Sequence, residues 1–245
     1  MKKIVLFCVV AASFAAAMTG CTTLYHPQLA DVPMIDHKGD IRVSLNGEVT
    51  TPYSVGSTVT VGVTDAFAIQ LHANTNIEVD KNFYSHLAAG LFKSMGSTLL
   101  EGYAALGFGI GENWNGADIL YTTKGHYVLP FLQLNYGLHN ATQAHIDAGV
   151  ALKVGAMVPE FTIHYYNNGS QPESFAEYAT ANMLLEPQFF FRIGGDKVRF
   201  TFQFGYNYLN DMHGFEDSHY LDWSWRPNPV RYDSFSASLG LTFYL

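Results

Sequence analysis

The segment 197–209 divides its side chains into two unbroken rows. One row is apolar and largely aromatic, and the other is polar or glycine. Residues 234–245, at the end of the chain, repeat the pattern. Because successive side chains of a strand point to opposite faces, each segment predicts a strand with one apolar and one polar face. Apolar rows this long and aromatic are typical of strands of about ten residues that cross a membrane, apolar outside and polar inside.

The composition agrees with an all-β membrane protein. Charged residues make up 14% of the chain and aromatic residues 15%, and the mean hydropathy is +0.05. A helical membrane protein is more hydrophobic, and most soluble domains carry more charge. No apolar run after Cys21 is long enough for a spanning helix. The net charge of −8, without a basic patch, argues against a nucleic-acid partner.

The first twenty residues predict a secretion signal. Lys2 and Lys3 precede an apolar stretch, 4–18, that is too short to span a membrane. The following residues, Met-Thr-Gly-Cys at 18–21, resemble the lipobox of bacterial lipoproteins. That resemblance implies that Cys21 becomes the first mature residue and carries acyl chains such as palmitate. The alternative is ordinary cleavage near Ala17, which leaves Cys21 a free thiol.

Three domains are expected: the signal peptide at 1–20, a lipidated tether at 21–39, and a barrel at 40–245. Pro27 and Pro33 stiffen the tether, and its charged residues favour contact with water. Thr22 follows the cysteine, where lipoproteins of an inner membrane usually have aspartate. The resemblance to lipoproteins therefore points to the outer membrane.

Strand patterns follow one another through the remainder of the chain. Ten strands are expected, at about 40–47, 56–63, 67–76, 83–92, 99–110, 126–137, 143–166, 181–193, 197–209 and 234–245. In the seventh, the apolar parity changes, which predicts a bulge near Val158 and Pro159. Pro130 and Pro187 fall inside strands, so each is expected to mark a bulge or an unpaired extension. The predicted fold is a closed, antiparallel, up-and-down transmembrane β-barrel of about ten strands.

The connections alternate between short and long. The long ones are 111–125, 167–179 and 211–231, so all of them lie at one end of the barrel. Outer-membrane barrels keep short turns in the periplasm and long loops outside. An even strand count then places the tether and Leu245 together on the periplasmic side, where a lipid on Cys21 enters the inner leaflet.

The C-terminal residues 240–245 begin with glycine and have hydrophobic or aromatic residues at alternate positions. They resemble the terminal signal of outer-membrane barrels, which the barrel-assembly machinery reads. The chain is thus similar to a small lipidated barrel of the outer-membrane β-barrel superfamily. This resemblance implies a fold, a location in the bacterial outer membrane and contact with its lipid, but no activity.

Following the alternation inward predicts a polar network in the barrel lumen. Its members are Arg42, His72, Glu101, Asp147, Lys153, Glu186, Arg192, Lys197 and Arg199. Buried charges need partners or water, and the interior of a small barrel is narrow enough for side chains to fill. The network is therefore either a structural plug or the lining of a selective pore.

The outer loops are acidic and carry the tryptophans. The residues that point to binding there are Trp114, Asp211, His213, Trp223 and Trp225. A tryptophan where a strand leaves the membrane is usually an interfacial anchor. The alternative for these tryptophans is that they stack on a sugar ring. The Asp and His residues have the chemistry for a metal or a rim hydrolase, and His164 with Ser170 for a lipid hydrolase, but their spacing is not diagnostic. No metal or cofactor is assigned.

The function expected from the sequence is non-enzymatic. A monomeric barrel would support the envelope or bind an envelope protein, a cation or a glycan through its outer loops. The first alternative is a narrow, porin-like channel, and the second is a protease or lipid-modifying hydrolase at the rim.

Overall fold

A computed structural model describes residues 25, 29–49, 53–76, 81–115, 120–139, 145–166, 174–179, 181–211 and 232–245. It contains eleven strands: β1 (Ile41–Glu48), β2 (Ser54–Gly62), β3 (Phe67–Asn76), β4 (Lys81–Met95), β5 (Thr98–Asn115), β6 (Leu120–Leu138), β7 (Asp147–Tyr166), β8 (Ser174–Tyr178), β9 (Asn182–Gly194), β10 (Val198–Asp211) and β11 (Tyr232–Tyr244). Within these residues, no helix is both long and apolar enough to cross a membrane.

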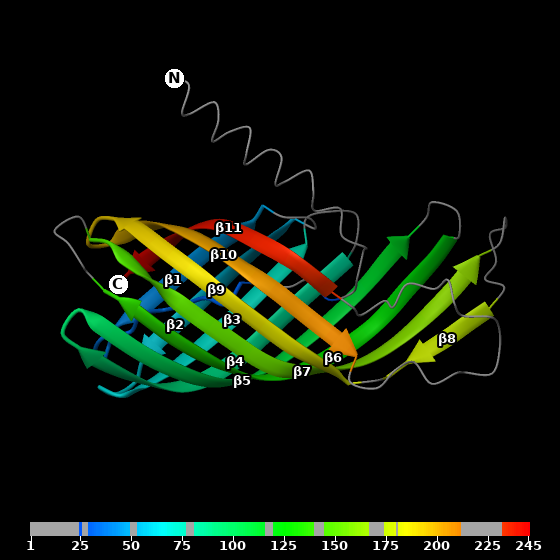
Figure 1. The fold of residues 1–245 in the computed structure, drawn as a ribbon, viewed down its shortest axis with the longest axis horizontal. Coiled ribbons are helices and arrows are strands. Elements are labelled where there is room, and N and C mark those ends of the chain that lie inside the picture. Colours follow the sequence, from blue (N-terminus) through cyan, green and yellow to red (C-terminus); the bar gives the residue numbers. More distant parts are fainter. Residues whose placement is uncertain are drawn as a thin grey trace, which may run out of the picture.

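The strands form a closed antiparallel cylinder (Figure 1). Each strand from β1 to β7 pairs with the next, β7 pairs with β9, and β9, β10 and β11 continue the sheet. The first and last strands pair from Arg42 opposite Tyr244 to Glu48 opposite Ser238, which closes the barrel. β8 pairs only with the outer part of β7. It lies beyond β9 and pairs with β7 in the same register as β9, so β8 and β9 together occupy one position in a ring of ten. The prediction of a closed up-and-down barrel of ten strands is confirmed.

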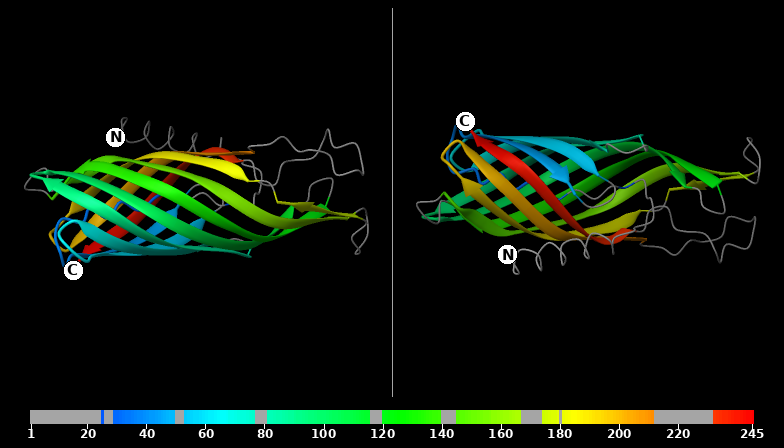
Figure 2. Two further views of the ribbon diagram at one scale, coloured as in Figure 1. Left: turned by 90° about the horizontal axis from the view of Figure 1, so that it is seen from below. Right: turned by 90° about the horizontal axis from the view of Figure 1, so that it is seen from above.

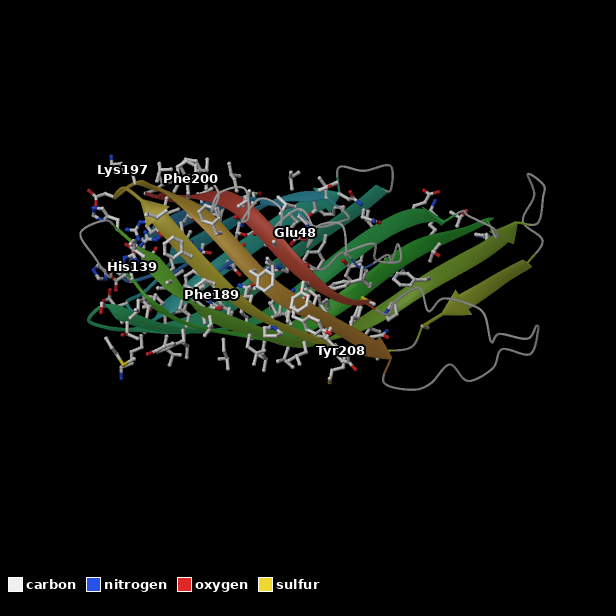
Figure 3. The ribbon with its side chains drawn as sticks, turned by 45° about the horizontal axis from the view of Figure 1, so that its top comes forward. Glu48, His139, Phe189, Lys197, Phe200 and Tyr208 are labelled. Carbon is white, nitrogen blue, oxygen red and sulfur yellow. The ribbon has the colours of Figure 1, made fainter. Side chains whose placement is uncertain are left out.

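The two faces of the wall differ as the alternation predicts. Outward side chains are large and apolar, and many remain exposed, for example Phe200 and Leu132, each at 62%. Inward side chains are mostly polar or charged, and they are buried. An apolar exterior around a polar interior is the arrangement of a transmembrane barrel, in which hydrocarbon replaces water on the outside. Figure 3 shows Phe189 and Phe200 on the wall.

The barrel has two distinct ends. The turn end carries the connections 63–66, 96–97, 139–146 and 195–197 together with Leu245. The loop end carries the connections that follow β1, β3, β5, β7 and β10, of which 212–231 is the longest. At the loop end, β5, β6, β7 and β8 continue well beyond the other strands (Figures 1 and 2). Residues 111–115, 120–125 and 174–178, expected in loops, are therefore strands.

The segment that precedes β1 does not leave the barrel at the turn end. From residue 40 it turns back into the lumen, where Val32, Met34 and Ile35 are fully buried. Farther along, Leu29 and Tyr25 are also buried. The prediction of a water-exposed tether beside Leu245 is therefore wrong for residues 29–35. The reason is their composition, because this stretch offers apolar side chains that a barrel of this width can enclose.

β7 is continuous and contains no bulge near Val158. Its register with β6 is the same on both sides, with Val128 opposite Val158 and Gly125 opposite Phe161. Phe161 is buried in the lumen, and its neighbour Glu160 points outward with its side chain 78% exposed. The expected change of face is therefore wrong. Phe161 lies toward the loop end, where the lumen is packed with aromatic residues and the outer surface is polar.

The prolines interrupt the ladder without shifting its register. Between β6 and β7, pairing stops at Val128 and resumes at Phe131, so Pro130 falls in the gap. Between β9 and β10, it stops at Gly205–Gln188 and resumes at Tyr208–Leu185, so Pro187 also falls in a gap. Neither proline marks a bulge. Proline has no backbone N–H to donate, so pairing is lost on one side of each proline. On the other side the register is kept, with Pro130 opposite Leu106 of β5 and Pro187 opposite Leu152 of β7.

Candidate functional site: the filled lumen

The lumen contains two apolar clusters, and the N-terminal segment contributes to both. Toward the turn end, Val32, Met34 and Ile35 pack against inward residues of the wall, including Phe92, Leu99, Tyr103 and Phe190. Toward the loop end, Tyr25 packs with Tyr84, Tyr127, Leu129, Phe131, Met157, Phe161, Leu184 and Leu209. The segment therefore fills the lumen along much of its length.

Glycines of β5 make room for the apolar cluster toward the loop end. A Cβ at Gly107 would collide with Tyr84, and one at Gly109 would collide with Tyr127. The two tyrosine rings therefore lie flat against β5 and stack on each other, with centroids 6.0 Å apart. Tyr25 meets Tyr127 edge-on at 5.8 Å. This is a packed aromatic arrangement and leaves the ring of Tyr25 enclosed.

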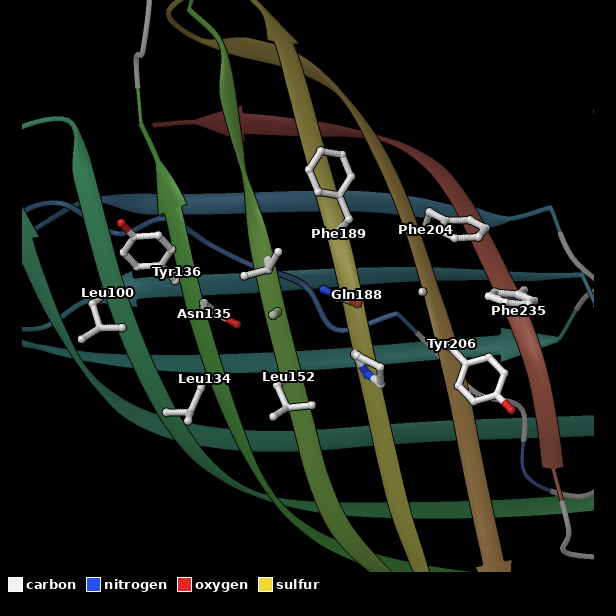
Figure 4. Close-up of a pocket in the computed structure, with 14 residues that line it drawn as sticks. Leu100, Leu134, Asn135, Tyr136, Leu152, Gln188, Phe189, Phe204, Tyr206 and Phe235 are labelled. Carbon is white, nitrogen blue, oxygen red and sulfur yellow. The ribbon is translucent and has the colours of Figure 1, made fainter. Parts of the chain in front are cut away.

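Four glutamines from four strands bind two consecutive carbonyl groups of the segment. The Ala30 carbonyl accepts from Gln188 at 2.5 Å and from Gln203 at 3.0 Å. The Asp31 carbonyl accepts from Gln133 at 2.9 Å and from Gln70 at 3.5 Å. Gln188 lies among the outward aromatic residues in sequence but faces the lumen (Figure 4). We name Gln70, Gln133, Gln188 and Gln203 the glutamine clasp.

Charged groups bind the same segment on either side of the clasp. Arg192 donates to the carbonyl of Val32, and its guanidinium lies 3.6 Å from the Asp31 carboxylate. The Ile35 amide donates to Glu101 Oε1 at 2.9 Å, and Glu101 also accepts from Asn135 at 3.0 Å. The lumen therefore binds this segment mainly through its backbone, as a strand is bound in a sheet.

A second polar group lies at the turn end around Asp147. Its carboxylate is 2.5 Å from Arg199 Nη1, accepts from Tyr244 at 2.6 Å, and lies 3.0 Å from His139 Nδ1. The guanidinium carbons of Arg42 and Arg199 lie 4.2 and 4.3 Å from the Tyr244 ring centre. Both cations therefore contact one aromatic ring while a buried carboxylate offsets their charge.

The remaining buried ion pair joins the wall to Tyr25. Lys153 Nζ lies 2.6 Å from Glu186 Oε2, and the Tyr25 hydroxyl donates to Glu186 Oε1 at 2.5 Å. Among the described residues, the acidic and basic side chains that are almost fully buried are Arg42, Lys153, Arg192 and Arg199 with Asp31, Glu101, Asp147 and Glu186. Asp31 comes from the segment and lies beside Arg192 of the wall, while Arg42 lies 3.2 Å from Asp40.

Most residues of the predicted luminal network are where the alternation places them. Lys197 is the exception, because it precedes β10 in the exposed turn at the turn end (Figure 3). His72 stacks on His86 at 4.9 Å and bonds to Thr58 at 2.8 Å. No group of three His, Cys, Asp or Glu within the described residues has the geometry to hold a metal ion.

The loop candidates are only partly placed. Trp114 belongs to β5, opposite Thr122, and Asp211 ends β10, opposite Asn182. The other three binding candidates, His213, Trp223 and Trp225, lie outside the described residues, as do Cys21 and Ser170. His164 lies on β7 between Thr122 and Phe175. The structure therefore does not bring the expected loop residues into one described site.

A hollow of about 570 Å³ lies on the outer wall across β5, β6, β7, β9, β10 and β11. Leu134, Leu152, Phe189, Phe204 and Phe235 surround it (Figure 4). Its lining is apolar and faces outward, where hydrocarbon surrounds the barrel. It is therefore part of the lipid-facing surface, and the polar chemistry of the protein lies in the lumen.

The alternation predicts the luminal side chains of the wall but not the segment that they bind. The signal for that segment was the stretch Leu29–Ile35, which is largely apolar in a region otherwise rich in charge. The glutamines carried no recognisable motif, because they are far apart in sequence and converge only when the barrel closes.

Comparison with known proteins gives similarity in fold only. No protein-family model matches the chain, and no curated protein matches it in sequence. Among solved structures, the N-terminal β-barrel domain of Pseudomonas aeruginosa OprF is 9% identical, with a TM-score of 0.35, over 85% of this chain and 98% of that one.

Two further solved structures match in the same way. The translocator domain of the autotransporter NalP from Neisseria meningitidis is 12% identical, with a TM-score of 0.36, over 99% of this chain and 97% of that one. OmpT, an outer membrane protein of Vibrio cholerae, is 10% identical, with a TM-score of 0.20, over 84% and 96%. At such low identities and TM-scores, none of these proteins bears on the function of this chain.

Proposed function

We propose that this protein is a non-conducting, non-enzymatic β-barrel of the bacterial outer membrane, anchored by acyl chains on Cys21. As a monomer, it supports the envelope or binds a partner of the envelope through its outer loops. The lipobox-like sequence at 18–21 and the terminal pattern at 240–245 support the location and the anchor. The apolar outer wall supports insertion into a membrane.

The observation that carries the proposal is the filled lumen. Residues 29–35 occupy it, the clasp binds their backbone, and each buried cation of the wall lies beside a carboxylate. A pore for ions or solutes needs a continuous watered path lined by polar groups. Apolar side chains of the segment, including Val32 and Ile35, instead occupy the lumen and pack against its wall.

The loop end is the surface that we assign to binding. Here the outer faces of the extended strands are polar, as the ion pairs Lys124–Glu112 at 3.9 Å and His126–Glu160 at 3.4 Å indicate. The connection 212–231, which joins β10 to β11 at this end, contains two tryptophans and several carboxylates. A rigid barrel that presents such a loop suits a cation, a glycan or an envelope protein.

Recording from planar lipid bilayers tests the closed lumen. The purified full-length protein is expected to give no current steps over a wide voltage range. A matched variant lacking residues 29–35 is expected to conduct, because the part of the lumen that the segment fills is then open to water. Stable current steps from the full-length protein would refute the non-conducting role and favour the channel.

Trimming the loop tests the binding role. Replacement of residues 212–231 by a short Gly-Ser linker is expected to abolish cross-linking to a partner in native envelopes. The matched control replaces the turn 195–197, at the opposite end of the barrel, and should keep the cross-link. The same cross-linked products from both variants and the wild type would exclude this loop as the binding surface.

A further inference from the structure

The luminal segment runs in one direction, and three contacts fix that direction. The amide of Leu29 donates at 3.0 Å to Glu48, the last residue of β1 at the loop end. The Ile35 amide bonds to Glu101, near the start of β5 at the turn end. Gly39 donates at 2.8 Å to the carbonyl of Gly62, where β2 ends. The chain therefore descends from the loop end to the turn end before β1 begins.

Tyr25 lies at the loop-end boundary of the apolar wall. Its ring contacts Tyr127, and the next residue on β6, Val128, faces outward. Leu138 faces outward at the opposite boundary. The eleven steps of strand between Tyr127 and Leu138 span roughly 36 Å, or roughly 28 Å of depth for a strand tilted by about 40°. Tyr25 is therefore about one bilayer core away from the turn end.

Covalent length limits where Cys21 lies. Four steps along the chain lead from Cys21 to Tyr25, and four fully extended steps span at most roughly 14 Å. That reach is about half of the depth between Tyr25 and the turn end. Acyl chains on Cys21 therefore cannot enter the leaflet at the turn end while residues 29–35 occupy the lumen.

Enclosing the segment does not require it to be pushed through a finished barrel. The barrel closes where β1 pairs with β11, the last strand of the chain. The segment directly precedes β1, so the wall can fold around it before this pairing forms. The glutamine clasp, whose members come from β3, β6, β9 and β10, is then completed only at closure.

We propose that the luminal segment carries the start of the mature chain to the outer side of the membrane. Cys21 and its acyl chains are then displayed at the cell surface, in the outer leaflet. This inference rests on the proposed outer-membrane location, with the loop end facing outward, and on lipidation of Cys21. It replaces the expectation that the anchor enters the periplasmic leaflet.

Labelling of single cysteines on intact cells tests this topology. Thr23→Cys is treated with a membrane-impermeant maleimide beside two controls, Glu160→Cys at the loop end and Asp196→Cys at the turn end. Both control side chains are exposed, at 78% and 81%. Thr23→Cys is expected to label on intact cells, as Glu160→Cys does, while Asp196→Cys labels only after the cells are opened.

Two results would overturn the inference. Labelling of Thr23→Cys only in opened cells would place residue 23 in the periplasm, and absence of labelling in both conditions would place it inside the protein. The wild-type chain separates this inference from the lipid anchor, because a lipidated Cys21 has no free thiol. If the wild type is labelled and its N-terminal mass is unmodified, the assignment of a lipid to Cys21 is refuted. The side of the membrane on which Cys21 reacts would still report the topology.

A disulfide tests whether the segment occupies the lumen in the membrane. A Cβ at position 205 would collide with the end of the Leu29 side chain. Leu29→Cys removes the colliding carbon, so Leu29→Cys with Gly205→Cys is expected to cross-link on mild oxidation. Leu29→Cys with Asp196→Cys is the matched control and should not. Cross-linking of the control pair alone would show that the segment leaves the barrel at the turn end, and the proposal would fail.

Discussion

Removal of Lys153 should destabilise the barrel strongly, because its partner is buried. Lys153 Nζ lies 2.6 Å from Glu186 Oε2, and the two side chains are only 4% and 1% exposed. Lys153→Met leaves the carboxylate without its cation in a lumen filled by the N-terminal segment. Loss of one partner of a buried pair costs about 3–5 kcal/mol. The free energy of unfolding should fall by that amount.

Urea unfolding in phospholipid vesicles, followed by far-UV circular dichroism, measures this loss. The double variant Lys153→Met/Glu186→Gln should recover most of it, because the amide carries no charge and still accepts the bond from Tyr25. Lys124→Met is the matched control. Its partner Glu112 is 3.9 Å away, and the Lys124 side chain is 70% exposed, so the change should be at most about 1 kcal/mol.

The comparison of Lys153→Met with Lys124→Met tests whether Glu186 is shielded from water. If Lys153→Met costs less than about 1 kcal/mol, like an exposed pair, then water reaches Glu186 and the lumen is not filled as described. An unrecovered double variant would show instead that the loss came from packing and not from charge.

Three further predictions follow from the same structure. Leu132→Arg places a cation on the lipid-facing wall, where the leucine is 62% exposed, and should lower the free energy of unfolding in vesicles by about 2–4 kcal/mol; a neutral result would contradict the membrane-spanning wall. Arg199→Met should cost about 3–5 kcal/mol because it removes the cation that pairs with the buried Asp147 carboxylate, whereas Lys197→Met in the exposed turn should stay within about 0.5 kcal/mol, and equal losses would refute this difference. The hydrogen bond to the backbone of Asp36, and then the Asp36 carboxylate, raise the pKa of His37 above its ordinary value; an NMR titration of Asp36→Asn should show a lower pKa for His37, and an unchanged pKa would exclude the contribution of the carboxylate.

The sequence predicts the wall because a strand in a membrane has two very different surroundings. Hydrocarbon outside and polar groups inside force a strict alternation over about ten residues, as in 197–209. The same alternation predicts that Arg42, Glu101 and Arg192 point inward, and all three are buried. The repeated alternation predicts the strand count. The connection lengths predict the two ends less well, because 139–146 at the turn end is longer than 116–119 at the loop end.

The alternation misleads where its physical cause is absent. Lys197 has the inward parity but lies in a turn, where no wall separates inside from outside. At Phe161, the outer surface is no longer lipid-facing, so the aromatic residue points inward and Glu160 outward. Periodicity alone does not record where a strand leaves the membrane.

The sequence by itself determined the barrel, its lipid-facing surface and the polarity of its lumen. Only the tertiary structure decided what fills that lumen. The contacts that hold the segment, such as Gln188 with Ala30 and Gln133 with Asp31, join residues more than a hundred positions apart. They come from several strands around the wall, which surround the segment only when β1 pairs with β11 and the cylinder closes. A stretch such as 29–35, with no periodicity of its own, therefore acquires its place from the closed wall around it.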